Sequence, residues 1–151
     1  MEKVCIADTR NQVDDFAVRK IQECGYGVRR MTLPFGDFAL LDNLTCAVDI
    51  KSSGGGVLEL SRNVCSKDHE RLRREILKCA EWNGKICFLI ANEDGITNID
   101  QLPNWKSPCY KSGKLKGKPF TQVKGETLMK ALLTMSQPNY YKDGLTVRFV
   151  F

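Results

Sequence analysis

Apolar and polar positions follow two periods along the chain, one typical of strands and one typical of helices. Runs rich in apolar residues predict strands at residues 4–9, 26–33, 86–91 and 145–151. Apolar residues at helical spacing predict amphipathic helices over residues 14–24, 57–64, 66–82 and 124–135. Because strands alternate with helices, we expect an α/β fold.

Two apolar segments on either side of an Asp-Asn turn signal predict a β-hairpin between residues 34 and 52. With a loop at 42–44, the strands pair so that Asp37 lies directly opposite Asp49. Because side chains alternate between the two faces of a strand, the hairpin has two faces. The expected core face carries Phe38, Leu40, Cys46, Val48 and Ile50. The other face, which alanines are expected to keep open, carries Asp37, Ala39, Ala47, Asp49 and Lys51.

The facing carboxylates of Asp37 and Asp49 need a physical explanation. Directly opposed side chains have Cβ atoms about 4.5–5.5 Å apart, where like charges repel each other. A divalent cation would remove the repulsion, and Mg²⁺ is typically held by one or two carboxylates together with substrate phosphate oxygens. Lys51, on the same face, can orient a water nucleophile or neutralise charge on a phosphate. The alternative is that Asp37 is a turn residue and that Asp49 and Lys51 form a solvated edge.

The hairpin carries Gly36-Asp37-Phe38 followed by Asp49-Ile50-Lys51-Ser52. This pair of motifs resembles the Gly-Asp…Glu-Arg-Lys signature of XPF-type structure-specific nucleases, within the PD-(D/E)XK superfamily. Residues 4–10 resemble the opening strand of that family, which ends in Asp-x-Arg-Glu. Residues 71–90 resemble its Arg-Leu helix and the apolar strand that follows. The resemblance in order and spacing covers residues 4–92.

The resemblance implies a restriction-endonuclease-like core, in which a mixed β-sheet is flanked by helices on both faces. It also implies an Mg²⁺ or Mn²⁺ ion held by Asp37 and Asp49. Asp8, at the carboxyl end of the first strand, would help as a third acidic group, and Lys51 would be the catalytic lysine. Arg10 is expected to contact DNA.

Arg71, at the start of a predicted helix, has two interpretations. It can contact a phosphate or the site, which makes it a candidate DNA-binding residue. Alternatively, it forms an (i, i+4) salt bridge with Glu75 on a solvated helix face.

The chain departs from the family pattern at several positions. Asn11 stands where the family has Glu, Asp49 replaces Glu, and Ile50 replaces Arg. Glu75 stands where a Gln is usual. The acid that usually follows the catalytic lysine falls at Gly55, inside a glycine-rich loop, so one ligand of the family site has no counterpart there.

Composition favours one globular domain with an anionic partner. The chain has 151 residues, of which 42% are hydrophobic and 27% charged, and we expect a single domain over 1–151. The formal net charge of +5 favours an anionic partner. No apolar run approaches the ~20 residues of a membrane span, and the N-terminus does not resemble a signal peptide. We expect no membrane association and a cytoplasmic location, in a bacterial or phage-infected cell.

Cysteine and histidine usage argues against several other kinds of site. The seven cysteines form no Cys-x-x-Cys pair, and His69 is the only histidine. We therefore expect neither a structural zinc site nor a Ser-His-Asp or Cys-His apparatus. The cysteines indicate small, mostly buried apolar residues in a reducing compartment. The glycine-rich loop lacks the Gly-Lys-Ser/Thr of a P-loop, so we expect no nucleotide cofactor.

Residues 93–123 are expected to form a long basic loop region. Between residues 101 and 123 there is no Asp or Glu, and lysines are interleaved with aromatic residues. The lysines are Lys106, Lys111, Lys114, Lys116 and Lys118. A mobile loop of this composition favours phosphate contacts and base stacking. The alternative is a loop that is merely solvated.

Together these features predict a metal-dependent DNA endonuclease, structure-specific in its choice of DNA, that hydrolyses phosphodiester bonds. Its partner would be branched, forked or duplex DNA. Two alternatives stay open: a non-catalytic DNA-binding module with the same fold, and a Holliday-junction resolvase with the same chemistry. The oligomeric state also stays open, with a homodimer as one alternative.

Overall fold

The computed structural model describes residues 2–10, 15–52, 55–66, 68–138, 140–141, 145 and 147–151. The strands are β1 (Val4–Asp8), β2 (Gly27–Met31), β3 (Phe38–Leu40), β4 (Asn43–Lys51), β5 (Lys85–Ile90) and β6 (Val147–Val150). The helices are α1 (Asp15–Glu23), α2 (Val57–Cys65), α3 (His69–Glu81), the 3₁₀-helix η2 (Ile99–Asn104) and α4 (Gly125–Met135). The predicted strands and helices are all present, displaced at their ends by a few residues at most.

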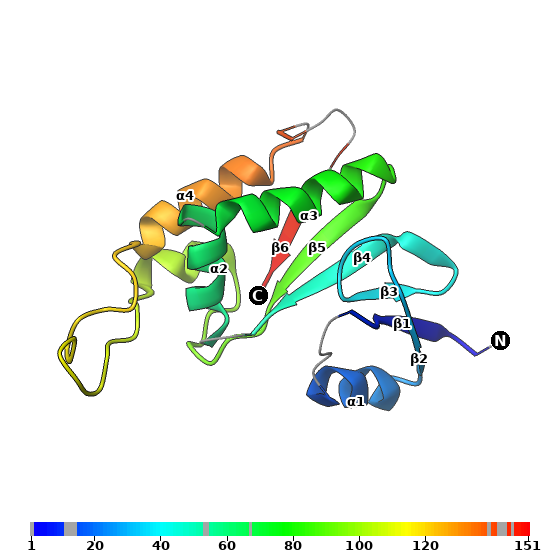
Figure 1. The fold of residues 1–151 in the computed structure, drawn as a ribbon, viewed down its shortest axis with the longest axis horizontal. Helices are drawn as coiled ribbons and strands as arrows, with labels where there is room; N and C mark the ends of the chain where they lie inside the picture. Colours follow the sequence, from blue (N-terminus) through cyan, green and yellow to red (C-terminus); the bar gives the residue numbers. More distant parts are fainter. Residues whose placement is uncertain are drawn as a thin grey trace.

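The strands form one mixed sheet in the order β2-β1-β3-β4-β5-β6 (Figure 1). β1 pairs with β2, β4 with β5 and β5 with β6 in parallel, whereas β3 runs antiparallel to both of its neighbours. This arrangement confirms the predicted α/β class with a mixed sheet. Because β4 and β5 are parallel, they end at the same edge, where Asp49 lies beside Phe88 and Lys51 beside Ile90.

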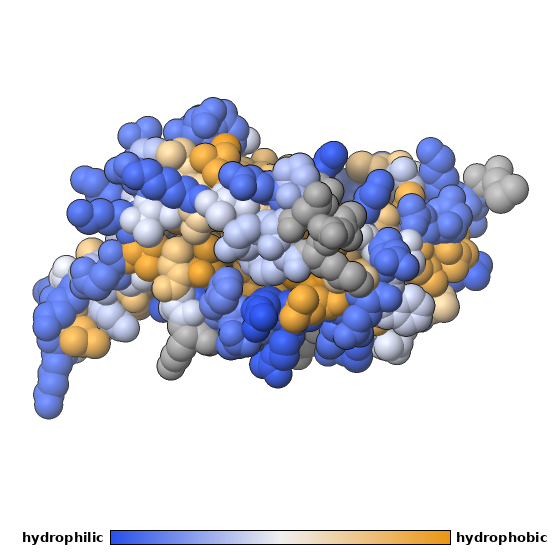
Figure 2. Space-filling view, turned by 90° about the horizontal axis from the view of Figure 1, so that it is seen from above, coloured by the Kyte–Doolittle hydropathy of each residue, from blue (hydrophilic) through white to orange (hydrophobic). Residues whose placement is uncertain are grey.

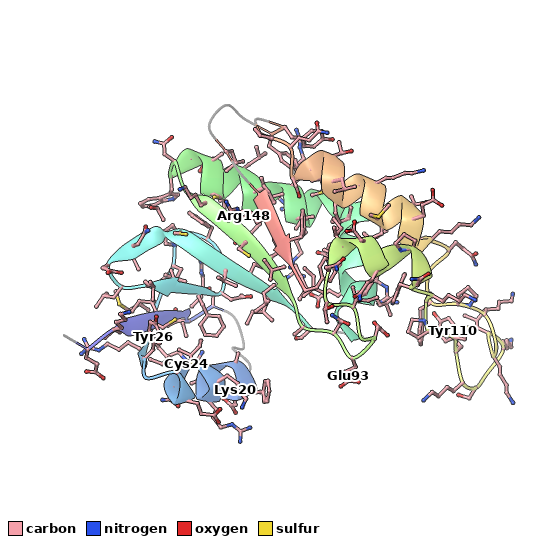
Figure 3. The ribbon with its side chains drawn as sticks, turned by 180° about the vertical axis from the view of Figure 1, so that it is seen from behind. Lys20, Cys24, Tyr26, Glu93, Tyr110 and Arg148 are labelled. Carbon is pink, nitrogen blue, oxygen red and sulfur yellow. The ribbon has the colours of Figure 1, made fainter. Side chains whose placement is uncertain are left out.

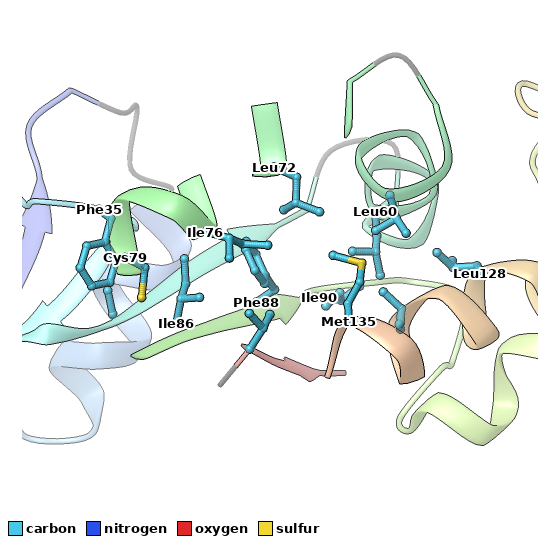
Figure 4. Close-up of a cluster of buried hydrophobic side chains, with 14 of the residues drawn as sticks. Phe35, Leu60, Leu72, Ile76, Cys79, Ile86, Phe88, Ile90, Leu128 and Met135 are labelled. Carbon is cyan, nitrogen blue, oxygen red and sulfur yellow. The ribbon is translucent and has the colours of Figure 1, made fainter. Parts of the chain in front are cut away.

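Helices lie on both faces of the sheet (Figure 1). On one face α2, α3 and α4 form the main core, to which Leu60, Ile76 and Leu128 contribute fully buried side chains (Figure 4). On the other face α1 packs over a smaller apolar cluster. No residue of α1 is fully buried, so this helix covers its face only in part.

The hairpin turn lies earlier in the chain than predicted. Two facing pairs keep the predicted register, Phe38–Val48 and Ala39–Ala47. A bulge then shifts the register, so that Leu40 pairs with Asn43 and the predicted loop at 42–44 is wrong. A bulge places an extra residue on one strand and displaces the pairing beyond it. The predicted register therefore holds at the end of the hairpin that leads to Asp37 and Asp49.

The predicted assignment of the two hairpin faces is only partly correct, since Phe38 is buried as expected but the residues below are not as predicted. Ala39 and Ala47, expected on an open face, are 5% and 1% exposed and belong to the main core. Leu40 and Cys46, expected in the core, are exposed. The physical reason is that the main core under α2, α3 and α4 includes the alanine face, whereas the small helix α1 leaves part of the other face uncovered. Asp37 and Asp49 therefore lie beside the main core and not on an open surface.

An apolar groove of about 620 Å³ remains between α1 and the second face of the sheet. Its lining includes Ile21, Tyr26, Val48, Ile50 and Leu89. Lys20, Cys24 and Tyr26 mark this side of the molecule in Figure 3. Because successive side chains of a strand point to opposite faces, the groove and the side chain of Asp49 lie on opposite faces of the sheet.

The cysteines differ in burial more than predicted. Cys5 and Cys79 are buried, whereas Cys24 and Cys46 are exposed, and all seven cysteines are free thiols. The expectation of mostly buried cysteines is therefore only partly met.

None of the helices in the described parts of the chain is both long and apolar enough to cross a lipid bilayer.

Candidate active site

Asp37 follows a tight turn that only glycine can make. Gly36 has φ +76°, and a Cβ built on it would lie 2.7 Å from the Ala47 Cβ. This close approach lets the Asp37 N–H donate to the Val48 carbonyl (2.8 Å), while the Asp37 Oδ2 accepts from the Ile50 N–H (2.7 Å). Asp37 is thus held against β4 by Val48 and Ile50, the two neighbours of Asp49. This places it close to the position opposite Asp49 that the sequence predicts.

Asp49 is a buried acid with an ion-pair partner on its own strand. It is 8% exposed, and Lys51 Nζ lies 2.7 Å from its Oδ1. This ammonium is within hydrogen-bond distance of Oδ1, and the described residues supply no other partner to that oxygen. A buried carboxylate is costly to ionise when one charged partner replaces the several water molecules that it has lost. The geometry leaves this oxygen able to accept a further positively charged partner.

Glu75 brings a third carboxylate toward this pair from helix α3. Its Oε1 accepts a hydrogen bond from the Gly36 N–H at 2.7 Å, directly before Asp37. Sequence reasoning treated this residue as a departure from the family pattern and as a salt-bridge partner of Arg71. No Arg71–Glu75 ion pair is found in the described residues, where Arg73 pairs instead with Glu70 on this helix.

The surroundings of Asp49 raise its pKa from 3.8 to about 6. Burial is the largest cause, and the ion pair with Lys51 opposes it. The negative charges of Asp37 and Glu75 raise the pKa further. Carboxylates from three elements thus act on one another, and a cation would relieve their repulsion.

Lys51 is held at the edge where β4 ends. Its carbonyl accepts a hydrogen bond from the Ala91 N–H at 2.9 Å, and its ammonium lies 5.6 Å from the centre of the Phe88 ring. With its side chain only 12% exposed, the ammonium is constrained by Asp49 on one side and the ring on the other. This arrangement can present a positive charge to a ligand that reaches Asp49.

The Asp8 carboxylate makes structural contacts, and its expected part in the metal site stays a prediction. It is 1% exposed, its Oδ1 accepts from the Leu33 N–H at 2.8 Å, and both of its oxygens accept from Arg10 Nε. Arg10 also donates to the Leu33 carbonyl. The carboxylate therefore fastens the end of β1 to the segment after β2. It touches the site only through its backbone, because the Asp8 N–H donates to the Asp37 carbonyl (2.8 Å).

The basic candidates fall into three environments. Arg10 is engaged by Asp8 and Leu33. Arg71 is exposed at the start of α3. The five lysines of the predicted loop, Lys106, Lys111, Lys114, Lys116 and Lys118, are all exposed. The structure does not bring these lysines into contact with Asp49, so they form a separate basic region.

The glycine-rich loop is described only in part, at Gly55 and Gly56 before α2. Ser53 and Gly54, like Asn11, lie outside the described residues. Gly55 and Gly56 have φ +90° and +84°, and a Cβ on Gly56 would lie 2.4 Å from the Ala91 carbonyl oxygen. The chain needs glycine at these two positions to enter α2, which is a physical reason for the lack of an acid at Gly55.

The donor set suits a hard divalent cation. Asp37 and Asp49 offer carboxylate oxygens, which Mg²⁺ prefers, and Mg²⁺ completes its shell with water and phosphate oxygens. No group of three or more His, Cys, Asp or Glu side chains in the described residues is spaced to hold an ion. Asp37 and Asp49 thus fit a site with two protein carboxylates, and the participation of Asp8 stays a prediction.

Comparison with protein-family models and with curated proteins finds no match to this chain. The functional argument therefore depends on the geometry of Asp37, Asp49, Lys51 and Glu75.

Proposed function

We propose that this protein is a divalent-metal-dependent DNA endonuclease whose centre is formed by Asp37, Asp49 and Lys51. The observation that carries the proposal is the buried Asp49 carboxylate, which lies near the negative charges of Asp37 and Glu75 and has the Lys51 ammonium 2.7 Å from its Oδ1. A buried carboxylate crowded by Asp37 and Glu75 lowers the stability of the fold. A phosphodiesterase needs such a carboxylate to hold its metal ion. The similarity to XPF-type nucleases rests on the same residues.

Each residue of the centre would have a distinct task. A Mg²⁺ or Mn²⁺ ion held by Asp37 and Asp49 would supply positive charge to the scissile phosphate and acidify a water molecule. Lys51 Nζ would donate to a non-bridging phosphate oxygen, because an ammonium has three N–H donors and its contact with Asp49 Oδ1 leaves others for a substrate. Glu75 would hold the Gly36 turn and so fix Asp37.

The positive charge of the chain supports DNA as the substrate. The net charge is +5, and exposed lysines are concentrated in the region after η2. Such charge gives affinity for a phosphate backbone without selecting a base sequence. Discrimination by DNA shape, as in a structure-specific nuclease, is consistent with this.

The experiment compares the wild-type protein with Asp49→Asn and Asp42→Asn on forked, four-way and plain duplex DNA. Asp42 lies in the exposed turn of the same hairpin, so it is a matched control for the charge change. With Mg²⁺ or Mn²⁺ we expect cutting by the wild type and by Asp42→Asn, and a loss of at least about a hundredfold in Asp49→Asn.

Three other outcomes have distinct meanings. Tight binding without cutting by any of the proteins supports the non-catalytic module and contradicts the proposal. Cutting by Asp49→Asn at the wild-type rate contradicts the assigned centre. Preferential cutting of the four-way DNA identifies the resolvase within the same chemistry.

A further inference from the structure

The basic region after η2 is a projecting arm, which we define as residues 106–124. It extends beyond the sheet and helices (Figure 1) and carries six lysines and no acidic residue. In the space-filling view it is a mostly hydrophilic projection with a small hydrophobic patch (Figure 2). The exposed apolar side chains in this range are Leu115 and Phe120, at 45% and 37% exposure.

The arm is a folded hairpin and not the mobile loop that its composition suggests. Cys109 and Pro119 form an antiparallel bridge. The Tyr110 N–H donates to the Lys118 carbonyl and the Gly117 N–H to the Tyr110 carbonyl, both at 2.9 Å. The rings of Tyr110 and Phe120 pack with their centres 4.3 Å apart. Aromatic packing and cross-chain hydrogen bonds therefore stiffen the shaft of the arm.

The base of the arm is anchored in the main core. Trp105 is 5% exposed, and its indole Nε1 donates to Asp94 Oδ2 at 3.2 Å. At the other end of the arm, a Cβ on Gly125 would lie 1.8 Å from the Leu102 carbonyl oxygen, so only glycine allows α4 to begin there. Because its base is anchored and its hairpin is ordered, the arm can hold its tip in a fixed position against a partner.

The tip places one apolar side chain between two cations. Leu115 stands between Lys114 and Lys116, and hydrogen bonds from Lys116 N–H to the Gly113 carbonyl (3.2 Å) and from Lys118 N–H to the Leu115 carbonyl (2.9 Å) close the turn. Leu115 belongs to neither apolar cluster of the fold. Its side chain is therefore available to an apolar surface of a partner, and the lysines on either side favour a partner that is anionic.

We infer that the arm is a wedge that enters branched DNA, with its lysines on the phosphates and Leu115 inserted between bases at the branch point. Proteins that kink or open duplexes insert a Leu, Phe, Ile or Met side chain between base steps in this way, with basic side chains on the adjacent backbone. Bases at a branch are already partly unstacked, so inserting a leucine costs less there than inside a duplex. The inference rests on the proposed function, which gives DNA as the partner. It adds that the arm selects DNA with a branch point.

The position of the arm agrees with this role. It extends from the end of the molecule at which β4 and β5 finish (Figures 1 and 3). The Ala91 N–H, just after β5, donates to the Lys51 carbonyl at the end of β4. Three residues after Ala91, Asp94 accepts a hydrogen bond from Trp105 at the base of the arm. DNA with its branch point on Leu115 would thus extend toward the edge of the sheet that carries Asp49.

The test uses forked DNA with 2-aminopurine at the branch point, a base analogue whose fluorescence rises when it is unstacked. Protein is added without divalent cation, so that cutting does not contribute. We expect the wild type to raise the fluorescence at the branch and not within the duplex arms. Leu115→Ser should abolish most of this rise while weakening binding by about tenfold at most.

Leu133→Ser is the matched control. Leu133 is 47% exposed on α4, outside the arm, so its substitution should leave both the fluorescence rise and the binding unchanged. Both substitutions are at exposed positions, and neither is expected to unfold the protein.

The result that would overturn the wedge is an equal fluorescence rise with Leu115→Ser and with the wild type. Binding and cutting without any rise would overturn it as well, and would leave the proposed function standing. A rise that needs Leu115, in a protein that never cuts DNA, would support the wedge and contradict the nuclease. Absence of DNA binding would contradict both.

Discussion

The Glu75 carboxylate holds the backbone of Gly36 from the neighbouring helix. Its Oε1 accepts from the Gly36 N–H at 2.7 Å, and Gly36 directly precedes Asp37. Helix α3 thereby fixes the turn that presents an acid to Asp49, and the same Glu75 charge raises the pKa of Asp49. One side chain thus contributes to the shape of the candidate centre and to its electrostatics.

Glu75 substitutions should separate these two contributions. Glu75→Ala leaves the Gly36 N–H without its acceptor, and we expect a loss of about 1–3 kcal/mol in the free energy of unfolding. Glu75→Gln keeps an oxygen acceptor and should cost much less. Urea denaturation of both variants measures this. Equal destabilisation by the two substitutions would contradict a role through the hydrogen bond.

Asp49 should make stability fall as the pH rises. Its pKa is about 6 in the folded protein against an ordinary 3.8, so between these values the folded state binds more protons than the unfolded state. The loss of folding stability caused by ionised Asp49 is absent below pH 3.8 and complete above about pH 6. Since each pKa unit corresponds to about 1.4 kcal/mol, the complete penalty is about 3 kcal/mol.

Asp49→Asn removes this titrating group, so the comparison with the wild type isolates it. Between about pH 4 and about pH 7, the difference in unfolding free energy should shift by about 3 kcal/mol in favour of Asp49→Asn. The measurement is chemical denaturation at several pH values with a chelator present. Parallel pH profiles for the two proteins would show that Asp49 has an ordinary pKa.

Gly125 is expected to tolerate no side chain. A Cβ there would lie 1.8 Å from the Leu102 oxygen and 2.8 Å from the Leu102 carbonyl carbon, and both are backbone atoms that cannot move alone. Gly125→Ala should cost roughly 2–4 kcal/mol and loosen the base of the arm.

Gly27→Ala is the control for this substitution. At Gly27 a Cβ would lie 2.8 Å from Glu2 Oε1, which is the end of a flexible side chain and can move away. Thermal melts of the two variants should differ clearly, and a Gly125→Ala melt as high as that of Gly27→Ala would refute the close packing.

The arm lysines should determine how DNA binding depends on salt. Each phosphate contact contributes about 0.9 to the slope of log K against log salt concentration, so replacing four arm lysines by alanine should reduce that slope by about 3–4. The four are Lys111, Lys114, Lys116 and Lys118. Replacing the exposed Lys78 and Lys85, at the ends of α3 and β5 away from the arm, should change the slope little. An unchanged slope after the fourfold substitution would place the DNA elsewhere.

Local sequence signals predicted the elements and part of the site. Apolar periodicity located the helices and strands, and the hairpin register held for Phe38–Val48 and Ala39–Ala47, beside the acid pair. The register failed beyond Ala39 because a bulge depends on how both strands pack and not on alternation.

Other features depend on contacts between distant segments. Whether Ala47 faces the core is decided by the helices that cover this side of the sheet. The hydrogen bond from Gly36 to Glu75 joins residues far apart in sequence, so spacing alone did not identify Glu75 as a site residue. The lysines and glycines of the arm have no apolar period, so the sequence alone predicts a mobile loop there. The Tyr110–Phe120 contact that orders it joins the two sides of the hairpin.

The most direct test of the account is Mn²⁺ binding to the purified protein, followed by the loss of the free-ion electron paramagnetic resonance signal. We predict that the wild type and Asp42→Asn take up the ion near neutral pH, and that Asp37→Asn and Asp49→Asn each weaken uptake by at least about tenfold. Equal uptake by all four proteins, or none by the wild type even with uncleavable DNA present, would contradict a cation held between Asp37 and Asp49.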